Sequence, residues 1–253
     1  MKVIPIQCLT DNYAYIISNN NSKIVGVVDP SEAPPITAFL KKKNLKLNYI
    51  LNTHHHFDHI GGNLELKKIY NANIVGFAGD KHRIPGIDTS LEDNEKWFFG
   101  NSSVKIFHIP GHTLGHICYF FEKEKIAFTG DTLFSLGCGR IFDGSHKQML
   151  ASLNKIKKFP KDTKIYCGQE YTYKNAEFCM KHDGNNIHLK KHFEKIKKLR
   201  SKNLPTVPTK LGDELKSNIF LRCDQNDLKI KLNMKNQDDF KIFKKVRDLK
   251  DSF

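Results

Sequence analysis

Residues 53–63 read Thr-His-His-His-Phe-Asp-His-Ile-Gly-Gly-Asn and place four histidines and one aspartate within six consecutive positions. Imidazoles crowded into one turn would repel one another once protonated, whereas a metal cation binds neutral imidazole and carboxylate together. We therefore interpret this stretch as a metal-binding loop rather than as a solvated polar turn. The candidate ligands in it are His54, His56, Asp58 and His59.

The segments on either side of this loop predict where it lies in the fold. Tyr49–Asn52 is expected to be a short buried strand, and Gly61-Gly62-Asn63 opens an amphipathic helical segment. A strand-to-helix loop is where α/β proteins usually place their chemistry. Three further candidates, His112, Asp131 and Gln169, also follow predicted strands. We therefore expect ligands from separate loops to converge at one edge of a sheet.

Alternating apolar patterns and turn residues predict strands first and helices later along the chain. The predicted strands are Lys2–Ile6, Ala14–Ser18, Lys23–Val28, Tyr49–Asn52, Ile74–Phe77, Glu95–Phe99, Ser103–Ile109, His116–Phe121, Lys125–Phe128 and Lys164–Cys167, with a turn at Asn19-Asn20-Asn21. The predicted helices are Ile36–Lys43, the segment after Gly62, Lys147–Lys158, Tyr173–His182, Asn186–Ser201, Leu211–Lys216 and Asp238–Leu249, with Pro205–Thr209 as an extended linker. The change from mostly strands to mostly helices along the chain predicts two domains, residues 1–170 and 171–253.

Length and composition indicate an ordinary globular protein. The chain has 253 residues, 39% of them hydrophobic, and can bury a sizeable core. No run approaches the ~18 apolar residues of a membrane span, and the N-terminus lacks the basic-then-apolar layout of a signal peptide. The six cysteines form no C-x-x-C pair, which favours free thiols. We expect a cytoplasmic monomer that does not bind membranes.

The net charge of +14 raises the possibility of a nucleic-acid partner. From Tyr171 onward there are 20 basic and 11 acidic residues, so +9 of this charge lies in the last third. The lysines are scattered and do not alternate with aromatic residues, as they do on surfaces that bind single strands. We interpret them as solvated helix faces and expect no nucleic-acid partner. A basic surface would also attract an anionic thioester.

The pattern H-x-H-x-D-H at residues 54–59 is the signature of the metallo-β-lactamase superfamily, and the chain resembles the glyoxalase II family (hydroxyacylglutathione hydrolases) within it. Five stretches carry the resemblance: Leu9–Tyr13, Thr53–Asn63, Gly111–Thr113, Thr129–Phe134 and Tyr166–Gly168. It extends from Met1 to the final Arg247–Phe253. It implies an α/β fold, in which a four-layer αβ/βα sandwich with the metal site precedes a smaller, mostly helical glutathione-binding domain.

The resemblance also implies two divalent metal ions, zinc with iron or manganese as alternatives. The implied ligands are His54, His56 and His112 at the first site, Asp58 and His59 at the second, and Asp131 between the two. One carboxylate can bridge two cations, and a hydroxide held between them is nucleophilic at neutral pH. Asp58 is implied to orient its proton, so Asp58 and Asp131 are the candidate catalytic residues.

The reaction implied by the resemblance is hydrolysis of S-D-lactoylglutathione and related 2-hydroxyacylglutathiones by the metal-bound hydroxide, giving D-lactate and glutathione from the first. The family's glutathione-binding positions correspond here to Arg140, Phe142, Tyr171, Arg247 and Lys250. Arg140 stands where lysine is usual, which keeps the charge and adds a fork suited to carboxylate. Phe142 stands where many members carry tyrosine, so one hydroxyl contact is lost.

Gln169 is the main departure from the family, which normally has histidine at this position as a ligand of the second metal. An amide offers only a neutral carbonyl oxygen or a donor, and is a weaker partner for a transition metal. We therefore predict that the second site binds its metal weakly.

Three other functions remain possible from the sequence. A persulfide dioxygenase of the same superfamily uses one iron with two histidines and an aspartate, and Gln169 favours it, whereas the helical tail with Arg247 and Lys250 favours the thioesterase. A metal-dependent nuclease is suggested only by the charge. A non-catalytic metal-binding module is least in keeping with ligands around an open position.

Overall fold

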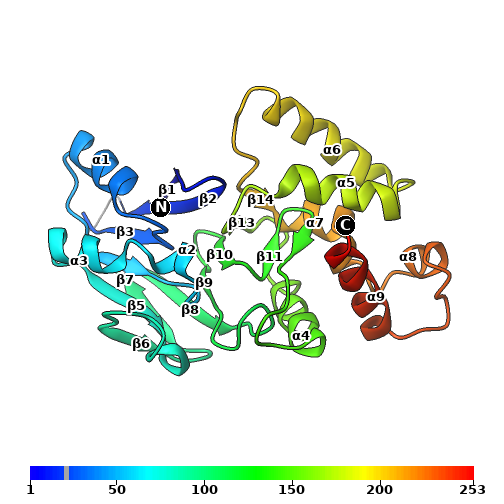
Figure 1. Cartoon of the computed structure of the whole chain (residues 1–253), viewed down its shortest axis with the longest axis horizontal. Helices are drawn as coiled ribbons and strands as arrows, with labels where there is room; N and C mark the ends of the chain where they lie inside the picture. Colours follow the sequence, from blue (N-terminus) through cyan, green and yellow to red (C-terminus); the bar gives the residue numbers. More distant parts are fainter. Residues whose placement is uncertain (20–22) are drawn as a thin grey trace. The chain divides into compact units, whose positions relative to one another are not determined.

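The structure is a computed structural model that describes residues 1–19 and 23–253 (Figure 1). The backbone divides into two compact units. Unit 1 comprises residues 1–108 and 115–130, and unit 2 comprises residues 109–114 and 131–253. The predicted domain boundary at residue 170 is a different division and stays a prediction. The turn predicted at residues 19–21 falls mostly outside the described residues.

The first sheet of unit 1 contains six strands that follow one another in chain order. They are β1 (Lys2–Cys8), β2 (Asn12–Ser18), β3 (Val25–Val28), β4 (Tyr49–Leu51), β5 (Asn73–Phe77) and β6 (Thr89–Leu91). The pairs from β1 to β3 are antiparallel and those from β3 to β6 are parallel. Parallel strands share a carboxyl edge, and the histidine loop leaves the sheet there, after β4.

Two helices cover this sheet. Helix α1 (Pro34–Lys42) begins with two prolines, whose missing N–H groups are harmless in a first turn. Helix α3 (Asn63–Tyr70) follows the histidine loop, which itself contains the short helix α2 (Phe57–Ile60). Apolar side chains of α1 and α3 are buried in one cluster with those of the sheet. The loop is therefore held at both ends by packed elements.

The second group of strands in unit 1 is antiparallel, in the order β10-β9-β8-β7. The strands are β7 (Lys96–Phe99), β8 (Ser102–His108), β9 (Ile117–Phe121) and β10 (Ile126–Gly130). Aromatic rings pack between the two groups, with centroids 5.6 Å apart for Tyr15 and Phe128. The buried Tyr119 hydroxyl donates to the carbonyl oxygens of Asn52 and Val75, at 3.0 and 3.1 Å. These contacts fix the strand ends that carry the site.

Unit 2 is mostly helical after β13, as the sequence predicts. Its elements are β11 (Leu133–Phe134), β12 (Gly137–Cys138), α4 (His146–Ile156), β13 (Lys164–Cys167), α5 (Thr172–Asp183), α6 (Ile187–Arg200), β14 (Thr209–Lys210), α7 (Leu211–Ser217), the 3-10 turn η2 (Ile219–Leu221), α8 (Asn226–Lys231) and α9 (Asp239–Asp251). Side chains of Ser145, Asn186 and Asp238 cap α4, α6 and α9 by accepting backbone N–H groups. Helices α5 and α6 lie side by side (Figure 1).

A buried carboxylate ties together the centre of unit 2. Glu214 on α7 is fully buried and accepts from the Ser135 hydroxyl, the Leu136 N–H, the Thr209 hydroxyl and the Asn218 amide. A buried charge is tolerated when its oxygens are satisfied in this way. This network holds the segment after Asp131 against α7.

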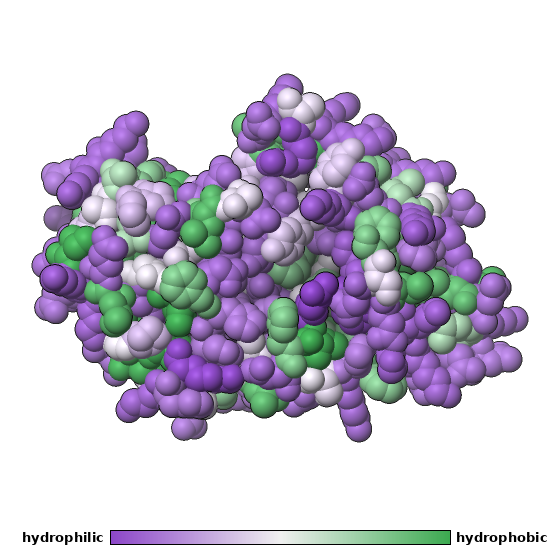
Figure 2. All heavy atoms as spheres, viewed as in Figure 1, coloured by the Kyte–Doolittle hydropathy of each residue, from purple (hydrophilic) through white to green (hydrophobic). Residues whose placement is uncertain are grey.

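The face shown in Figure 2 is mostly hydrophilic, with hydrophobic residues in small separate groups. Within the described part of the chain, no helix is long and apolar enough to cross a membrane.

Candidate metal centre and substrate site

Unit 1 brings four of the predicted metal ligands together in the loop after β4. The His54 ring centroid lies 4.8 Å from that of His56 and 4.1 Å from that of His59. His54 Nε2 and His56 Nδ1 are 3.2 Å apart, and His59 Nε2 lies 3.4 Å from Asp58 Oδ2. His54 and His59 are buried. The loop therefore gathers imidazole nitrogens and a carboxylate, which are donors suited to divalent metal ions.

The second nitrogen of two of these histidines is held by the protein. Asp29 Oδ2 lies 3.0 Å from His59 Nδ1 and also accepts a hydrogen bond from the Thr53 hydroxyl. The oxygen of that hydroxyl lies 3.0 Å from His54 Nδ1. Asp29 Oδ1 accepts from the Thr53 N–H at 2.8 Å. Metal-binding histidines characteristically have their other nitrogen fixed by such a partner, which sets the tautomer and the ring orientation.

Asn12 holds the Asp58 carboxylate of this loop. Its amide donates to Asp58 Oδ2 at 2.9 Å and to the Asp58 carbonyl oxygen at 3.2 Å. Asn12 and Asp29 contact candidate ligands, and sequence reasoning did not predict these contacts. Asn12 lay in a stretch that resembled the family, but Asp29-Pro30 signalled only the end of a strand, so no pattern pointed to its contact with His59.

Unit 2 contributes two further predicted ligands. His112 Nε2 lies 3.5 Å from Asp131 Oδ2, and His112 Nδ1 donates to the Arg140 carbonyl oxygen at 2.7 Å. Gly111, before His112, has φ +151°, and a Cβ there would lie 2.6 Å from the backbone of Met149. Glycine at this position therefore lets the backbone turn close to Met149 just before His112.

Gly130, before Asp131, is constrained in the same way. Its φ is +45°, and a Cβ there would lie 2.4 Å from Thr53 Oγ1. Only glycine adopts this left-handed backbone at no steric cost, and the close approach leaves no room for a side chain. The turn after β10 therefore depends on Gly130.

Gln169 is buried, two residues beyond the end of β13. Burial raises the pKa of the neighbouring Cys167 thiol to about 12, and the negative charges of Glu170 and Asp131 add to the shift. The structure places Gln169 in unit 2 with His112 and Asp131, and its role as a ligand stays a prediction.

Three of the predicted substrate-binding residues gather near His112 and α9. Arg140 Nε lies 3.4 Å from Asp251 Oδ1, which also accepts from Arg247 Nη2 at 3.0 Å. The Phe142 ring centroid lies 5.2 Å from that of His112. Arg140 and Phe142 are exposed at 61% and 60%, so a ligand can reach both.

Arg247 and Lys250, on the same face of α9, differ in exposure and contacts. Arg247 is buried, and its guanidinium donates to the Cys138 carbonyl oxygen at 2.8 Å. The Lys250 ammonium lies over the rings of Phe178 and Phe253, at 5.1 and 4.9 Å. Burial and the Arg247 charge lower the pKa of Lys250. Arg247 therefore anchors α9 to β12, whereas the Lys250 ammonium lies against aromatic rings.

Tyr171 stands apart from this group in the contacts it makes. Its ring centroid is 5.4 Å from that of Phe134, and its carbonyl oxygen accepts from the Asn175 N–H in the first turn of α5. The residue is 39% exposed, so a ligand can reach part of it.

His55, between two predicted ligands, is paired elsewhere. His55 Nδ1 lies 2.9 Å from Asp80 Oδ2, and the buried Asp80 also accepts from Arg83. We predict that His55→Ala lowers stability by about 1–3 kcal/mol, because a buried carboxylate loses one partner. The melting temperature should fall by about 2–4 °C per kcal/mol, with metal content unchanged. Loss of metal without loss of stability would instead make His55 a ligand.

Comparison with known proteins identifies the family. Residues 10–168 match the family model described as the metallo-beta-lactamase superfamily, and residues 170–253 match the hydroxyacylglutathione hydrolase C-terminus. A hydroxyacylglutathione hydrolase of Pelagibacter ubique is 51% identical over the full length of both chains. One of Methylococcus capsulatus is 41% identical over 100% of this chain and 99% of the relative.

Solved structures agree on the fold. The BLEG-1 B3 metallo-beta-lactamase aligns with a TM-score of 0.66 at 26% identity, covering 87% of this chain and 98% of its own. ETHE1 from Myxococcus xanthus aligns with a TM-score of 0.68 at 20% identity, covering 99% and 98%, a likeness of fold alone.

The fold and the His/Asp donors define an α/β protein suited to binding divalent metal ions. The chain belongs to the metallo-β-lactamase superfamily and, within it, to the hydroxyacylglutathione hydrolases, a family of thioester hydrolases. The predicted family and fold class are confirmed.

Proposed function

We propose that this protein hydrolyses S-D-lactoylglutathione to D-lactate and glutathione, and acts on related 2-hydroxyacylglutathiones. The observation that carries the proposal is the match of both parts of the chain, including the C-terminal 170–253, to hydroxyacylglutathione hydrolases. A cytoplasmic monomer with no nucleic-acid partner remains our expectation.

The donor set fits divalent metal ions. Three candidate ligands are imidazoles with one nitrogen beside a hydroxyl, a carboxylate or a carbonyl oxygen, at His54, His59 and His112. We propose that His54, His56 and His112 hold the first ion, that Asp58, His59 and Gln169 hold the second, and that Asp131 bridges them, with zinc as the expected metal and iron or manganese as alternatives. When bound, such ions polarise a carbonyl and lower the pKa of water.

The remaining chemistry is assigned to side chains of this chain. Asp58 would take part in holding the proton of the attacking water, and the Asn12 amide would keep the Asp58 carboxylate in position. Arg140, Arg247 and Lys250 would attract the glutathione carboxylates, and Phe142 and Tyr171 would pack beside the thioester. In this division of roles, the side chains that recognise the glutathione carboxylates lie away from the thioester bond that is hydrolysed.

One set of assays tests the proposal against its alternatives. The metal-loaded protein is expected to release thiol from S-D-lactoylglutathione, detected with a thiol reagent. It should not consume oxygen with glutathione persulfide and should not cleave a phosphodiester. Oxygen uptake without thioester hydrolysis would replace the proposal with a dioxygenase, and phosphodiester cleavage would replace it with a nuclease.

Lys250→Ala should raise KM about tenfold with little change in kcat, because Lys250 would bind a carboxylate remote from the reacting carbon. Raising the ionic strength should raise KM in the parent for the same reason. Lys181→Ala is the matched control, because the Lys181 ammonium also lies over the Phe253 ring, at 5.2 Å, but is not in the proposed site. An unchanged KM in Lys250→Ala would remove it from the substrate site.

Arg247→Ala should also raise KM, and in addition it should lower the stability of the protein. The Cys138 carbonyl oxygen would lose a buried donor, which costs about 1–3 kcal/mol. Thermal unfolding of the two α9 variants separates the anchoring contact from substrate binding, because only Arg247→Ala should lower the melting temperature. Equal melting temperatures would contradict the anchoring role.

A further inference from the structure

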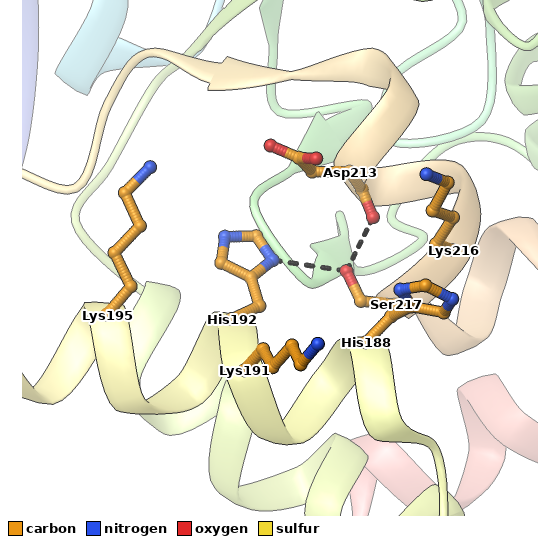
Figure 3. Close-up of a pocket in the computed structure, with 7 residues that line it drawn as sticks. All are labelled: His188, Lys191, His192, Lys195, Asp213, Lys216 and Ser217. Carbon is orange, nitrogen blue, oxygen red and sulfur yellow. Dashed lines mark hydrogen bonds between the residues drawn. The ribbon is translucent and has the colours of Figure 1, made fainter.

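Unit 2 contains a polar pocket of about 240 Å³ between α6 and α7 (Figure 3). None of the proposed metal or glutathione ligands lines it. Its walls are formed by His188, Lys191, His192, Lys195, Asp213, Lys216 and Ser217.

The spacing of these residues explains how they face one cavity. His188, Lys191, His192 and Lys195 lie three and four residues apart, and so share one face of α6. Asp213, Lys216 and Ser217 come from α7 on the opposite side (Figure 3). His192 Nδ1 lies 3.1 Å from the Ser217 oxygen, and the Ser217 hydroxyl donates to the Asp213 carbonyl oxygen at 2.7 Å. The first of these contacts joins α6 to α7, and the second holds the Ser217 side chain against its own helix.

The walls of the pocket carry more lysines than acidic residues. Among the described residues, the ammonium groups of Lys191, Lys195 and Lys216 have no ion-pair partner. Lys191 and Lys195 are four residues apart on one helix, where like charges destabilise each other. With both histidines neutral, three lysines and Asp213 leave a charge of +2, which rises as His188 and His192 protonate. An anion bound between the walls would relieve this repulsion.

We propose that this pocket binds a small phosphate monoester that also carries hydroxyl groups. Lysine ammonium groups suit a phosphate as point charges, and the Asp213 carboxylate can accept hydrogen bonds from hydroxyls of the same ligand. A volume of about 240 Å³ lies just below the ~300–1,000 Å³ of ligand pockets, which suits a small molecule rather than a polymer. The proposal does not depend on thioester hydrolysis.

The test is a titration of the full-length protein with inorganic phosphate and with glucose 6-phosphate at constant pH and ionic strength. Imidazole NMR signals of His188 and His192, assigned with His188→Gln and His192→Gln, report binding in the pocket. Both signals should shift and saturate, at lower concentration for glucose 6-phosphate. Lys191→Gln, Lys195→Gln and Lys216→Gln should each weaken binding by about threefold to fivefold. Histidine signals that do not move would overturn the proposal.

Two matched variants locate the ligand. Lys190→Gln removes the same charge from α6 outside the pocket, and Lys198→Gln removes it from a neighbouring hollow that shares Lys191 and Lys195. Both should bind glucose 6-phosphate like the parent. Equal weakening in Lys190→Gln would mean diffuse attraction, and equal weakening in Lys198→Gln would move the ligand to the neighbouring hollow. Preferential binding of a single-stranded RNA oligonucleotide, weakened by all these variants alike, would overturn the proposal in favour of a nucleic-acid surface.

Discussion

Asp131→Ala is expected to abolish thioester turnover and to lower the metal content of the purified protein. In the proposed centre this carboxylate contacts both ions, and its Oδ2 lies 3.5 Å from His112 Nε2. Changes in the groups around metal ligands already cost on the order of 10–100-fold in affinity or activity. Loss of a shared ligand should therefore lower kcat/KM by more than about 100-fold. Elemental analysis and thiol release on the same samples measure both effects.

His82→Ala is the control for this experiment, because His82 is exposed and is not a proposed ligand. It should retain parental activity and metal. His54→Ala, His56→Ala and His112→Ala should resemble Asp131→Ala, with first-site metal lost. Normal turnover in Asp131→Ala would refute the bridging assignment, and loss of turnover with full metal content would confine Asp131 to a role in orienting the substrate or water.

The long elements could be predicted from the sequence because burial of their regularly spaced apolar residues is also what stabilises the fold. Strand β9 and helix α4 lie within one or two residues of their predicted bounds, since continuous or periodic apolar residues are buried in each. Short elements such as β6 and α8 were missed. They have only three and six residues, too few for a period to be recognised, and pairing or packing stabilises them.

The candidate site was predictable to the extent that residue type reveals chemistry. His54, His56, Asp58 and His59 identified themselves because clustered donors are unfavourable without a cation. Asn12 and Asp29 did not, because asparagine and aspartate are common at strand and turn ends. Their function arises only when folding brings them within 3.0 Å of Asp58 and His59. Sequence therefore indicates the ligands more readily than the groups that orient them.

The same limit applies to Arg247. The family resemblance implied that Arg247 binds glutathione, but it did not indicate that the guanidinium is buried and donates to the Cys138 carbonyl oxygen. Residue type alone could not distinguish an anchor from a group that binds substrate. That distinction depends on contacts 109 positions apart in the chain.

Gln169→His is expected to raise the metal content toward two ions per chain, whereas the parent should hold fewer than two, with the first site filled preferentially. Gln169 is buried in unit 2, two residues beyond the end of β13. An amide oxygen is a weaker donor than imidazole for a transition metal. Substitutions of residues that only contact metal ligands change metal affinity on the order of 10–100-fold, so we expect the affinity of the second site to rise by a similar factor in the variant. Thioesterase activity at limiting metal should rise with it.

The decisive measurement is elemental analysis of the parent and Gln169→His after identical dialysis against a weak chelator. Gln169→Glu is a useful third protein, because it keeps the size of the side chain but supplies a charged oxygen ligand. Its metal content should exceed that of the parent, at a level between the parent and Gln169→His or above both. Thermal unfolding of each apo-protein separates ligand chemistry from packing at this buried position. Two ions in every one of the three proteins would mean that glutamine already completes the second site, whereas equal, low content in all three would place Gln169 outside the centre.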